Sequence, residues 1–369
     1  MPSETATPPV RTLADVLDPP AGKTEVVGPY MARKSVDVPS DRTDVPFVLT
    51  EAVREVAVSL FKNTQSDYGA GIPSKDVRKW DMFWAREHAA FLSFLVKGKG
   101  TSYEEYLPGR YYTYIRIADA IQEHAGELAG KRIVDVGGGS GIGLVIAAGK
   151  DAVVFNVDHS AGALNYFRYL ARHYGVPDKR ISTRRTDFYS TSYPDNEFDV
   201  AYNVGVVEHL SDEEQRKLVE EMWRITSPGG LVLIATPNNK SPLYQATHRR
   251  ERKVFGKQGY TRYMYLLPDW AESRDVDMER LVAGAGLEVI ASDGVLLFPS
   301  SKEFYNGLKD PELIGFYGSL PKVTPKGEGI DFTRNLMAYC RVMEQNLASQ
   351  ETRLRKGWFK YVVARKPTQ

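Results

Sequence analysis

The chain has 369 residues, which is enough for one large hydrophobic core or two smaller ones. Its 48 Lys and Arg residues against 47 Asp and Glu residues leave a net charge of +1, which excludes a whole-molecule attraction to nucleic acid or to an anionic membrane. The single cysteine, Cys340, excludes an intrachain disulfide framework and a cysteine-rich zinc site.

The N-terminal sequence lacks the basic start and apolar core of a signal peptide. The longest apolar runs, such as residues 89–96, are much shorter than the ~20 residues that cross a bilayer. We therefore expect a soluble, cytoplasmic protein without a membrane partner.

The N-terminal part divides in two by composition. Residues 1–46 are rich in Pro, Asp, Thr and Ser and lack apolar periodicity, so we expect a flexible arm. Residues 47–110 carry apolar side chains at helical spacing and predict a helical cap. One stripe of this cap consists of Trp80, Phe83, Trp84, Phe91 and Leu95. The stripe is either core or a lid over an apolar substrate.

Residues 111–369 form the third and largest part, in which predicted helices and strands alternate. Within residues 106–132, apolar side chains share one helical face, and this helix is expected to end at Gly130. Apolar runs then predict strands at residues 132–137, 152–158, 181–187, 197–210 and 231–239. The helix before the last of these strands is expected to end on Pro-Gly-Gly at 228–230. This alternation predicts a doubly wound, Rossmann-like, mostly parallel sheet with helices on both faces.

Two insertions interrupt the alternation, at about 240–275 and 299–357. We expect them to form a substrate lid together with the N-terminal helices. Further strands are predicted at residues 287–298 and 358–367.

A glycine-rich turn, GGGSG, lies between the first of these strands and its helix. Glycine lets a backbone approach a ligand closely. A dinucleotide site requires a glycine at the sixth position of its motif, where this chain has Ile142, Leu144 or Ile146. No lysine follows the turn, so the phosphate-binding loop of nucleotide hydrolases is excluded as well. The pattern that remains is an acidic residue followed by three alternating glycines, namely Asp135, Gly137, Gly139 and Gly141.

This pattern resembles the class I S-adenosylmethionine-dependent methyltransferases, and in particular the subgroup that includes the ubiquinone-biosynthesis O-methyltransferases. The resemblance covers about residues 111–367 without the two insertions, and it implies a seven-stranded sheet closed by an antiparallel hairpin. It implies that Asp158, 23 residues after Asp135, holds the cofactor ribose beside His159. Asp187 and Phe188 correspond to the adenine contact. The segment NVGVVEHLSD, which begins at Asn203, corresponds to the part that receives the methionine ammonium.

Two residues of that segment are candidates for a catalytic base. His209 is the residue type that titrates near neutral pH, and in the resembled subgroup it is often structural or cofactor-adjacent instead. Glu208 is the other candidate, and its alternative role is a solvated or helix-capping carboxylate.

The run from residue 248 to residue 265 concentrates basic and aromatic side chains. Three interpretations are open: a solvated loop, a site for an anionic substrate group, or an RNA contact. The neutral overall charge offers little support for RNA binding. We assign substrate contacts to Arg249, Arg250 and Tyr263, and to Tyr111 from the preceding part of the chain.

The resemblance implies methyl transfer to an O, N or C nucleophile of a small molecule in cofactor, lipid or secondary metabolism. The tyrosines and tryptophans of the predicted lid favour a mid-sized, partly apolar or aromatic acceptor. The cofactor would be S-adenosyl-L-methionine and the product S-adenosyl-L-homocysteine, with no metal and no nucleic acid. One alternative is a cyclase or rearrangement catalyst that binds the cofactor without net methyl transfer. A non-catalytic binding protein and a dinucleotide oxidoreductase are further alternatives, and the oligomeric state is open.

Overall fold

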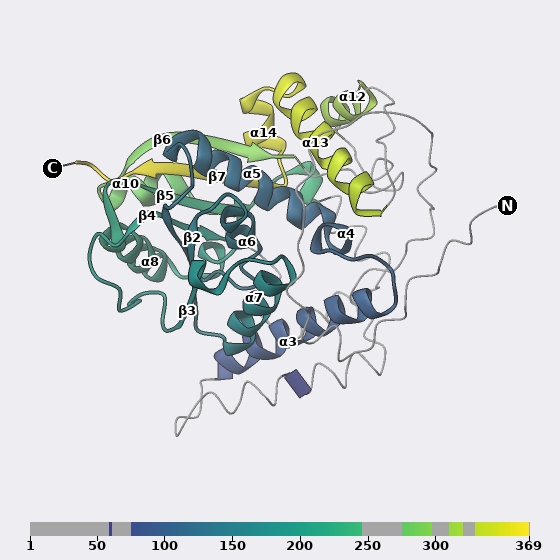
Figure 1. The fold of residues 1–369 in the computed structure, drawn as a ribbon. Helices are drawn as coiled ribbons and strands as arrows, with labels where there is room; N and C mark the ends of the chain where they lie inside the picture. Colours follow the sequence, from purple (N-terminus) through teal and green to yellow (C-terminus); the bar gives the residue numbers. More distant parts are fainter. Residues whose placement is uncertain (1–58, 61–74, 246–274, 297–309, 320–328, 369) are drawn as a thin grey trace.

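The computed structural model describes residues 59–60, 75–245, 275–296, 310–319 and 329–368 (Figure 1). The predicted arm at residues 1–46 lies outside the described residues, as do Arg249, Arg250 and Tyr263. Within the described ranges, no helix has both the length and the apolar character needed to span a bilayer.

A seven-stranded sheet forms the centre of the molecule, as predicted. Its strands run in the order β3-β2-β1-β4-β5-β7-β6, and only β7 is antiparallel to its neighbours. The strands are β1 (Arg132–Val136), β2 (Val153–Asp158), β3 (Ile181–Arg185), β4 (Phe198–Val204), β5 (Thr226–Pro237), β6 (Glu288–Val295) and β7 (Phe359–Arg365). The strand order reverses between β1 and β4, and in such sheets ligands bind at this point, beyond the carboxyl ends of the strands.

Helices cover both faces of the sheet. One core packs α5 (Pro108–Ala125), α6 (Ile142–Ala148) and α7 (Ala161–His173) against side chains such as Ile133 and Val154. The other packs α8 (Asp212–Ile225) and α10 (Met278–Gly284) against the alternate residues, such as Val134 and Phe155. The period-two alternation of the strands therefore supplies two cores, which is typical of a doubly wound sheet.

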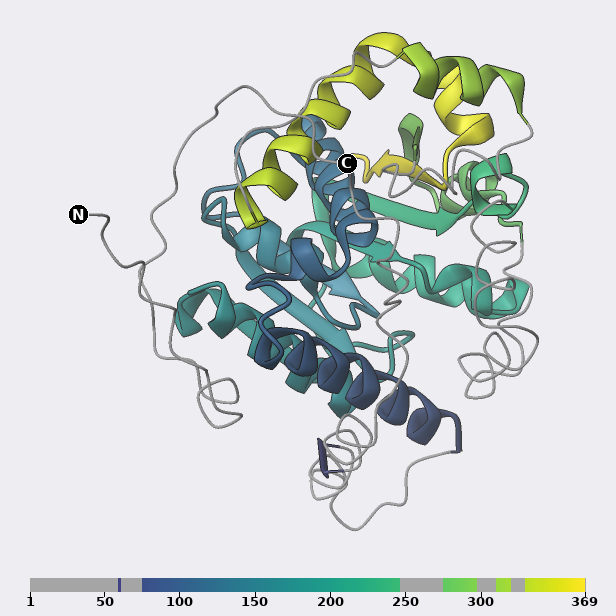
Figure 2. The same ribbon diagram turned by 90° about the vertical axis from the view of Figure 1, so that its right-hand side faces the viewer.

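The predicted helical cap contains α3 (Lys75–Val96) and α4 (Tyr103–Tyr106). Figures 1 and 2 show α3 lying along α7, outside the layer that covers the sheet. Its apolar stripe packs inward, since Phe83, Phe91 and Leu95 are buried.

The second insertion contains α12 (Pro311–Ser319), α13 (Gly329–Leu347) and α14 (Gln350–Lys356), which lie between β6 and β7 in the sequence. A buried ion pair joins α13 to α5: the Arg116 guanidinium lies 3.3 Å from the Glu344 carboxylate. The Tyr112 hydroxyl donates to the same carboxylate at 3.0 Å. These contacts attach the insertion to the sheet-covering layer.

Two helix ends differ from the sequence predictions. Helix α5 ends at Ala125 with Gly126 at φ +78°, not at Gly130, because the first available glycine already reverses the backbone. Helix α8 ends at Ile225 and β5 begins directly at Thr226, not after Pro-Gly-Gly. The residue before a proline avoids the helical region, so Pro228 moves the helix end toward the N-terminus.

Candidate functional site

The glycine-rich turn connects β1 to α6 at the point where the strand order reverses. Gly137, Gly139 and Gly141 all have positive φ, of +82°, +53° and +61°. The N–H groups of Gly137 and Gly138 donate to the Val157 carbonyl at 2.8 and 3.1 Å, which fixes the turn to the end of β2. This left-handed backbone is accessible to glycine at little cost.

Protein side chains already lie against all three alternating glycines. A Cβ atom at Gly137 would be 2.9 Å from Val206, one at Gly139 would be 2.3 Å from the Trp84 indole, and one at Gly141 would be 2.3 Å from the Phe167 ring. These glycines therefore allow close packing within the protein as well as a ligand's approach.

Asp135, the last residue but one of β1, is 1% exposed. Neither oxygen of its carboxylate has a hydrogen-bond partner of regular geometry among the described residues. Burial raises the pKa of Asp135 well above its usual range, and the neighbouring Tyr202 hydroxyl opposes this rise. A buried carboxylate without a hydrogen bond of regular geometry is rare in folded proteins, and it is the arrangement expected where a ligand supplies further donors.

Asp158 ends β2 on the other side of the turn. One carboxylate oxygen accepts from the Gly139 N–H at 3.0 Å and the other from the Ser160 N–H at 2.8 Å. Burial raises the pKa of this carboxyl, against the effect of His159 and of these N–H donors. The carboxylate thus joins the glycine turn to the start of α7.

The two residues predicted to contact the adenine, Asp187 and Phe188, follow the end of β3. Phe188 is buried, and its ring centre is 5.8 Å from that of His159 with the planes at 34°. Asp187 is exposed, and its carboxylate accepts from the Tyr189 N–H at 2.9 Å, which makes it a turn residue in this structure. The structure thus brings His159 and Phe188 together, with Asp187 at the surface beside them.

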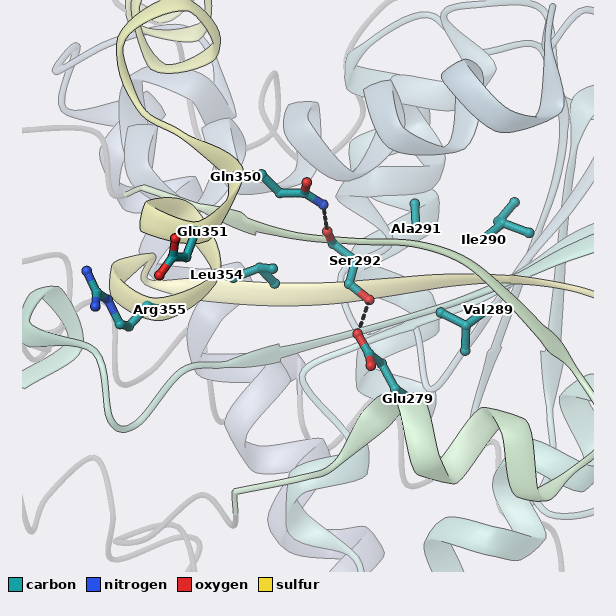
Figure 3. A pocket seen from close by; sticks show the side chains of 9 residues that line it. All are labelled: Glu279, Val289, Ile290, Ala291, Ser292, Gln350, Glu351, Leu354 and Arg355. Atoms are coloured by element: carbon teal, nitrogen blue, oxygen red, sulfur yellow. Dashed lines mark hydrogen bonds between the residues drawn. The ribbon is translucent and has the colours of Figure 1, made fainter.

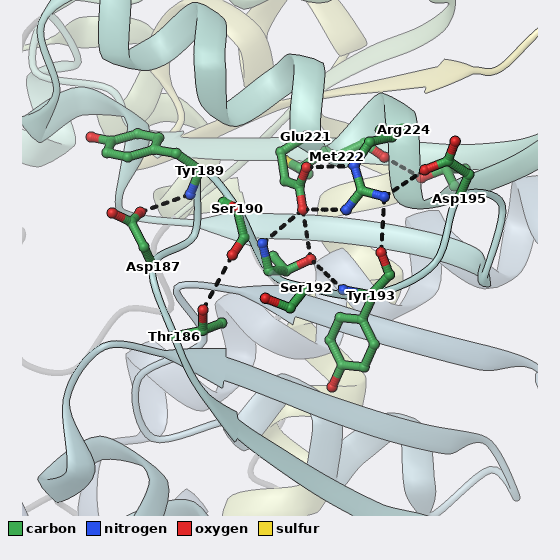
Figure 4. A network of polar contacts seen from close by, with 12 residues as sticks. Thr186, Asp187, Tyr189, Ser190, Ser192, Tyr193, Asp195, Glu221, Met222 and Arg224 are labelled. Atoms are coloured by element: carbon green, nitrogen blue, oxygen red, sulfur yellow. Dashed lines mark hydrogen bonds and ion pairs between the residues drawn. The ribbon is translucent and has the colours of Figure 1, made fainter. Parts of the chain in front are cut away.

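Figure 4 shows how the loop that carries these residues is held. Glu221 of α8 accepts from the N–H and the hydroxyl of Thr191, at 2.8 and 2.6 Å. Arg224 donates to Glu221 and, at 2.8 Å, to the Tyr193 carbonyl. The loop between β3 and β4 is therefore fixed to α8 by a network of hydrogen bonds and ion pairs.

The β4 segment lies across the turn. Asn203 is completely buried, its amide donates to the Val136 carbonyl, and its amide oxygen has no partner among the described residues. Glu208 and His209 follow in a short 3-10 helix, Val207–His209, with 3.6 Å between the Glu208 carboxylate and the His209 ring nitrogen. Burial raises the pKa of Glu208 to about 8 and lowers that of His209 to about 4.

Two helices outside the predicted motifs also reach this region. From α3, Trp84 lies against Gly139, and the ring centre of Trp80 is 6.3 Å from that of His209. From α5, the Tyr114 ring lies against Gly143 of α6. Burial raises the pKa of Tyr114, and the Asp135 and Glu208 carboxylates raise it further. The spacing of apolar residues indicated the α3 stripe but not the element that it contacts, and no motif marked Tyr114 as a site residue.

Tyr111 is the predicted substrate residue of α5. Its ring centre is 6.5 Å from that of Tyr103. Burial, followed by the Glu104 carboxylate, raises its pKa. Tyr114, one helical turn further on, is the α5 tyrosine beside Asp135 and Glu208.

No group of three or more His, Cys, Asp or Glu side chains within the described ranges is arranged to hold a metal ion. A shallow, open depression lies far from the glycine turn, between β6, α10 and α14 (Figure 3). Two hydrogen bonds of Ser292, to Glu279 and Gln350, cross it.

Comparisons with known proteins find similarity to methyltransferases. A family model described as a methyltransferase domain matches residues 134–234. A probable S-adenosylmethionine-dependent methyltransferase of Mycolicibacterium smegmatis is 30% identical over 138 residues, which are 37% of this chain and 50% of that protein. A ubiquinone biosynthesis O-methyltransferase of Thiobacillus denitrificans is 29% identical over 184 residues, which are 48% of this chain and 73% of that protein. Among solved structures, the cyclase SpnF aligns with a TM-score of 0.41 and 17% identity over 69% of this chain and 81% of that chain.

Proposed function

We propose that this chain, which belongs to the class I S-adenosylmethionine-dependent methyltransferases, transfers a methyl group to an O, N or C nucleophile of a mid-sized, partly apolar or aromatic small molecule. The observation that carries the proposal is the buried Asp135 carboxylate, which has no regular hydrogen-bond partner and lies beside a left-handed glycine turn at the switch point of the sheet. A cationic amino acid group is the ligand that such a carboxylate would pair with.

The residues around the turn suit the parts of this cofactor. Asp158 has two carboxylate oxygens at the end of β2, and a vicinal diol offers two donors to such a group. The Phe188 ring offers an apolar face to a base, beside His159. Asp135 and the Asn203 amide oxygen would receive the methionine ammonium. The cofactor supplies an electrophilic methyl group, so the protein mainly has to orient the acceptor and exclude water.

Glu208 is better suited than His209 to act as the catalytic base. A base works best when its pKa is near the working pH. The pKa of Glu208 is about 8, whereas that of His209, about 4, makes the imidazole a weak base. One oxygen of Glu208 also lacks a partner among the described residues. In this proposal Glu208 removes the proton of the acceptor, and His209 lines the site beside Trp80.

The aromatic residues of α3 and α5 favour an acceptor with an apolar or aromatic part. Trp80, Trp84 and Tyr114 are only partly buried and lie around the turn and His209. Rings placed in this way bind flat apolar groups by stacking and by burial of surface.

Two measurements test the proposal. Calorimetric titration with S-adenosylhomocysteine and, separately, with NAD should show binding of the first only, and preference for NAD would refute the assignment. Mass spectrometry of reactions with a panel of phenols, amines and carbon acids should show S-adenosylhomocysteine and a product heavier by one methylene. Product formation without S-adenosylhomocysteine would indicate a cyclase or rearrangement catalyst instead.

A further inference from the structure

We propose that Asp81 of α3 is a positioning residue of the cofactor site, which fixes the Asp158 carboxylate through Ser160 and so makes the N-terminal cap part of that site. The inference rests on the proposed role of Asp158 as the ribose-binding residue. It concerns a residue outside the sheet domain, 77 residues before Asp158.

The contacts of Asp81 are specific and buried. Asp81 is completely inaccessible to solvent, although it lies on the outer helix α3. One oxygen of its carboxylate accepts from the Ser160 hydroxyl at 2.7 Å and from the Gly162 N–H at 3.0 Å. Both donors belong to the start of α7, so Asp81 pairs with the first turn of that helix, where a negative charge is favoured.

Ser160 connects the two carboxylates. Its hydroxyl donates to Asp81, while its N–H donates to Asp158 at 2.8 Å. The same hydroxyl accepts from the Ala163 N–H at 3.1 Å and so caps α7. A shift of Ser160 would therefore move one of the two hydrogen bonds that orient Asp158.

The approach of α3 to this point depends on a glycine. A Cβ atom at Gly162 would lie 3.0 Å from the Asp81 carbonyl oxygen, which leaves no room for a larger residue without displacement of α3. One helical turn further, Trp84 lies against Gly139, whose N–H is the other donor to Asp158. Helix α3 thus contacts both backbone segments that hold Asp158.

Charge supplies a second link between the two carboxylates. The pKa of Asp81 is raised, mainly by burial and to a smaller extent by Asp158. This repulsion is mutual, so Asp81 also disfavours the ionised form of Asp158. The other charged or titratable groups that face this pair are His159 beside Asp158, Asp135 from β1, and Arg185 from β3, which faces Asp81.

The test compares Asp81→Ala and Asp81→Asn with the unmodified protein, with S-adenosylhomocysteine as the titrant in calorimetry at several pH values. Asp81→Ala should weaken binding about tenfold, the scale of one hydrogen bond to a charged group, while kcat at saturating cofactor changes less than about twofold. Asp81→Asn keeps the acceptor oxygen, so it should retain most of the affinity at pH 7. Because it removes the negative charge, it should move the acidic limit of binding to lower pH.

Asp119→Ala is the matched control. Asp119 of α5 pairs with Arg341 of α13 at 2.7 Å and with Lys150, which follows α6, at 3.9 Å. This variant should bind the titrant like the unmodified protein. Equal weakening in Asp119→Ala and Asp81→Ala would overturn the inference in favour of general destabilisation.

The remaining outcomes separate the two proposals. Normal binding by Asp81→Ala, together with weak binding by Asp158→Ala, overturns this inference alone. No binding by the unmodified protein overturns the proposed function and this inference with it. If Asp81→Ala does not fold, Asp81→Asn provides the test. An acidic limit of binding that is the same in Asp81→Asn as in the unmodified protein would overturn the inference.

Discussion

The contact between Gly139 and Trp84 can be tested by adding one methyl group. In Gly139→Ala, a Cβ would lie 2.3 and 2.6 Å from two carbons of the Trp84 indole, where carbon atoms normally stay about 3.5 to 4.0 Å apart. The indole would have to move by more than about 1 Å. Overpacking of this kind costs about 1 to 3 kcal/mol. The left-handed φ of +53° adds about 1 to 2 kcal/mol for any residue with a Cβ.

Gly130→Ala separates the two contributions. Gly130 has a similar φ of +74°, and a Cβ there would meet no atom within 4 Å. This variant should lose only about 1 to 2 kcal/mol of unfolding free energy. Gly139→Ala should lose about 2 to 5 kcal/mol, so the difference between the variants measures the indole contact.

The assay is urea denaturation followed by far-UV circular dichroism, for both alanine variants in the unmodified and the Trp84→Ala backgrounds. Without the indole, the excess cost of Gly139→Ala over Gly130→Ala should disappear. Equal costs in the unmodified background, or an excess that persists without Trp84, would refute the packing of α3 on the turn.

Three further outcomes are expected. Asp158→Ala should weaken S-adenosylhomocysteine binding by about 1.5 to 3 kcal/mol in calorimetry, and unchanged affinity would remove Asp158 from the cofactor site. His209→Gln should retain most turnover while Glu208→Gln loses it, and the opposite order in steady-state assays would make His209 the base. Because the folded pKa of Glu208, about 8, exceeds its ordinary value of 4.5, its contribution to stability is present below pH 4.5 and is lost as the pH rises through 8. In thermal melts, Glu208→Gln should therefore be more stable than the unmodified protein at pH 8. The difference in melting temperature between the two proteins should favour the variant more at pH 8 than at pH 5, and equal differences would contradict the shift.

The sheet and the glycine turn could be predicted because their signals are local. Strand β1, the glycine turn and α6 occupy consecutive residues, and their periodicities follow from backbone geometry. The link between Asp158 and helix α3 through Ser160 could not be predicted in this way. The hydroxyl of Ser160 reaches Asp81 across 79 residues of sequence, and no local pattern encodes that distance. The spacing of the α3 stripe indicated a buried face, but the element that covers Trp84 depends on tertiary packing.

The same limit applies to α5. Tyr111 and Tyr114 lie on one helix, three residues apart, and both are aromatic residues near the predicted cap. The packing of α5 against α6 places the Tyr114 ring against Gly143, where an added Cβ would lie 2.8 Å from the ring. Tyr111 lies instead beside Tyr103 and Glu104. A periodicity gives the angle between two side chains around a helix but not which one faces a ligand.

The glycines of the turn are weaker evidence for a ligand than the carboxylate beside them. Val206, Trp84 and Phe167 each fill the space that a Cβ would need, so internal packing alone already requires Gly137, Gly139 and Gly141. Packing does not require Asp135, because a buried carboxylate without a regular hydrogen bond destabilises the fold and an apolar residue of similar size would remove that cost. Groups that destabilise the fold in this way concentrate at functional sites. The case for a cationic ligand at the switch point therefore depends on Asp135 more than on the glycine pattern that first indicated it.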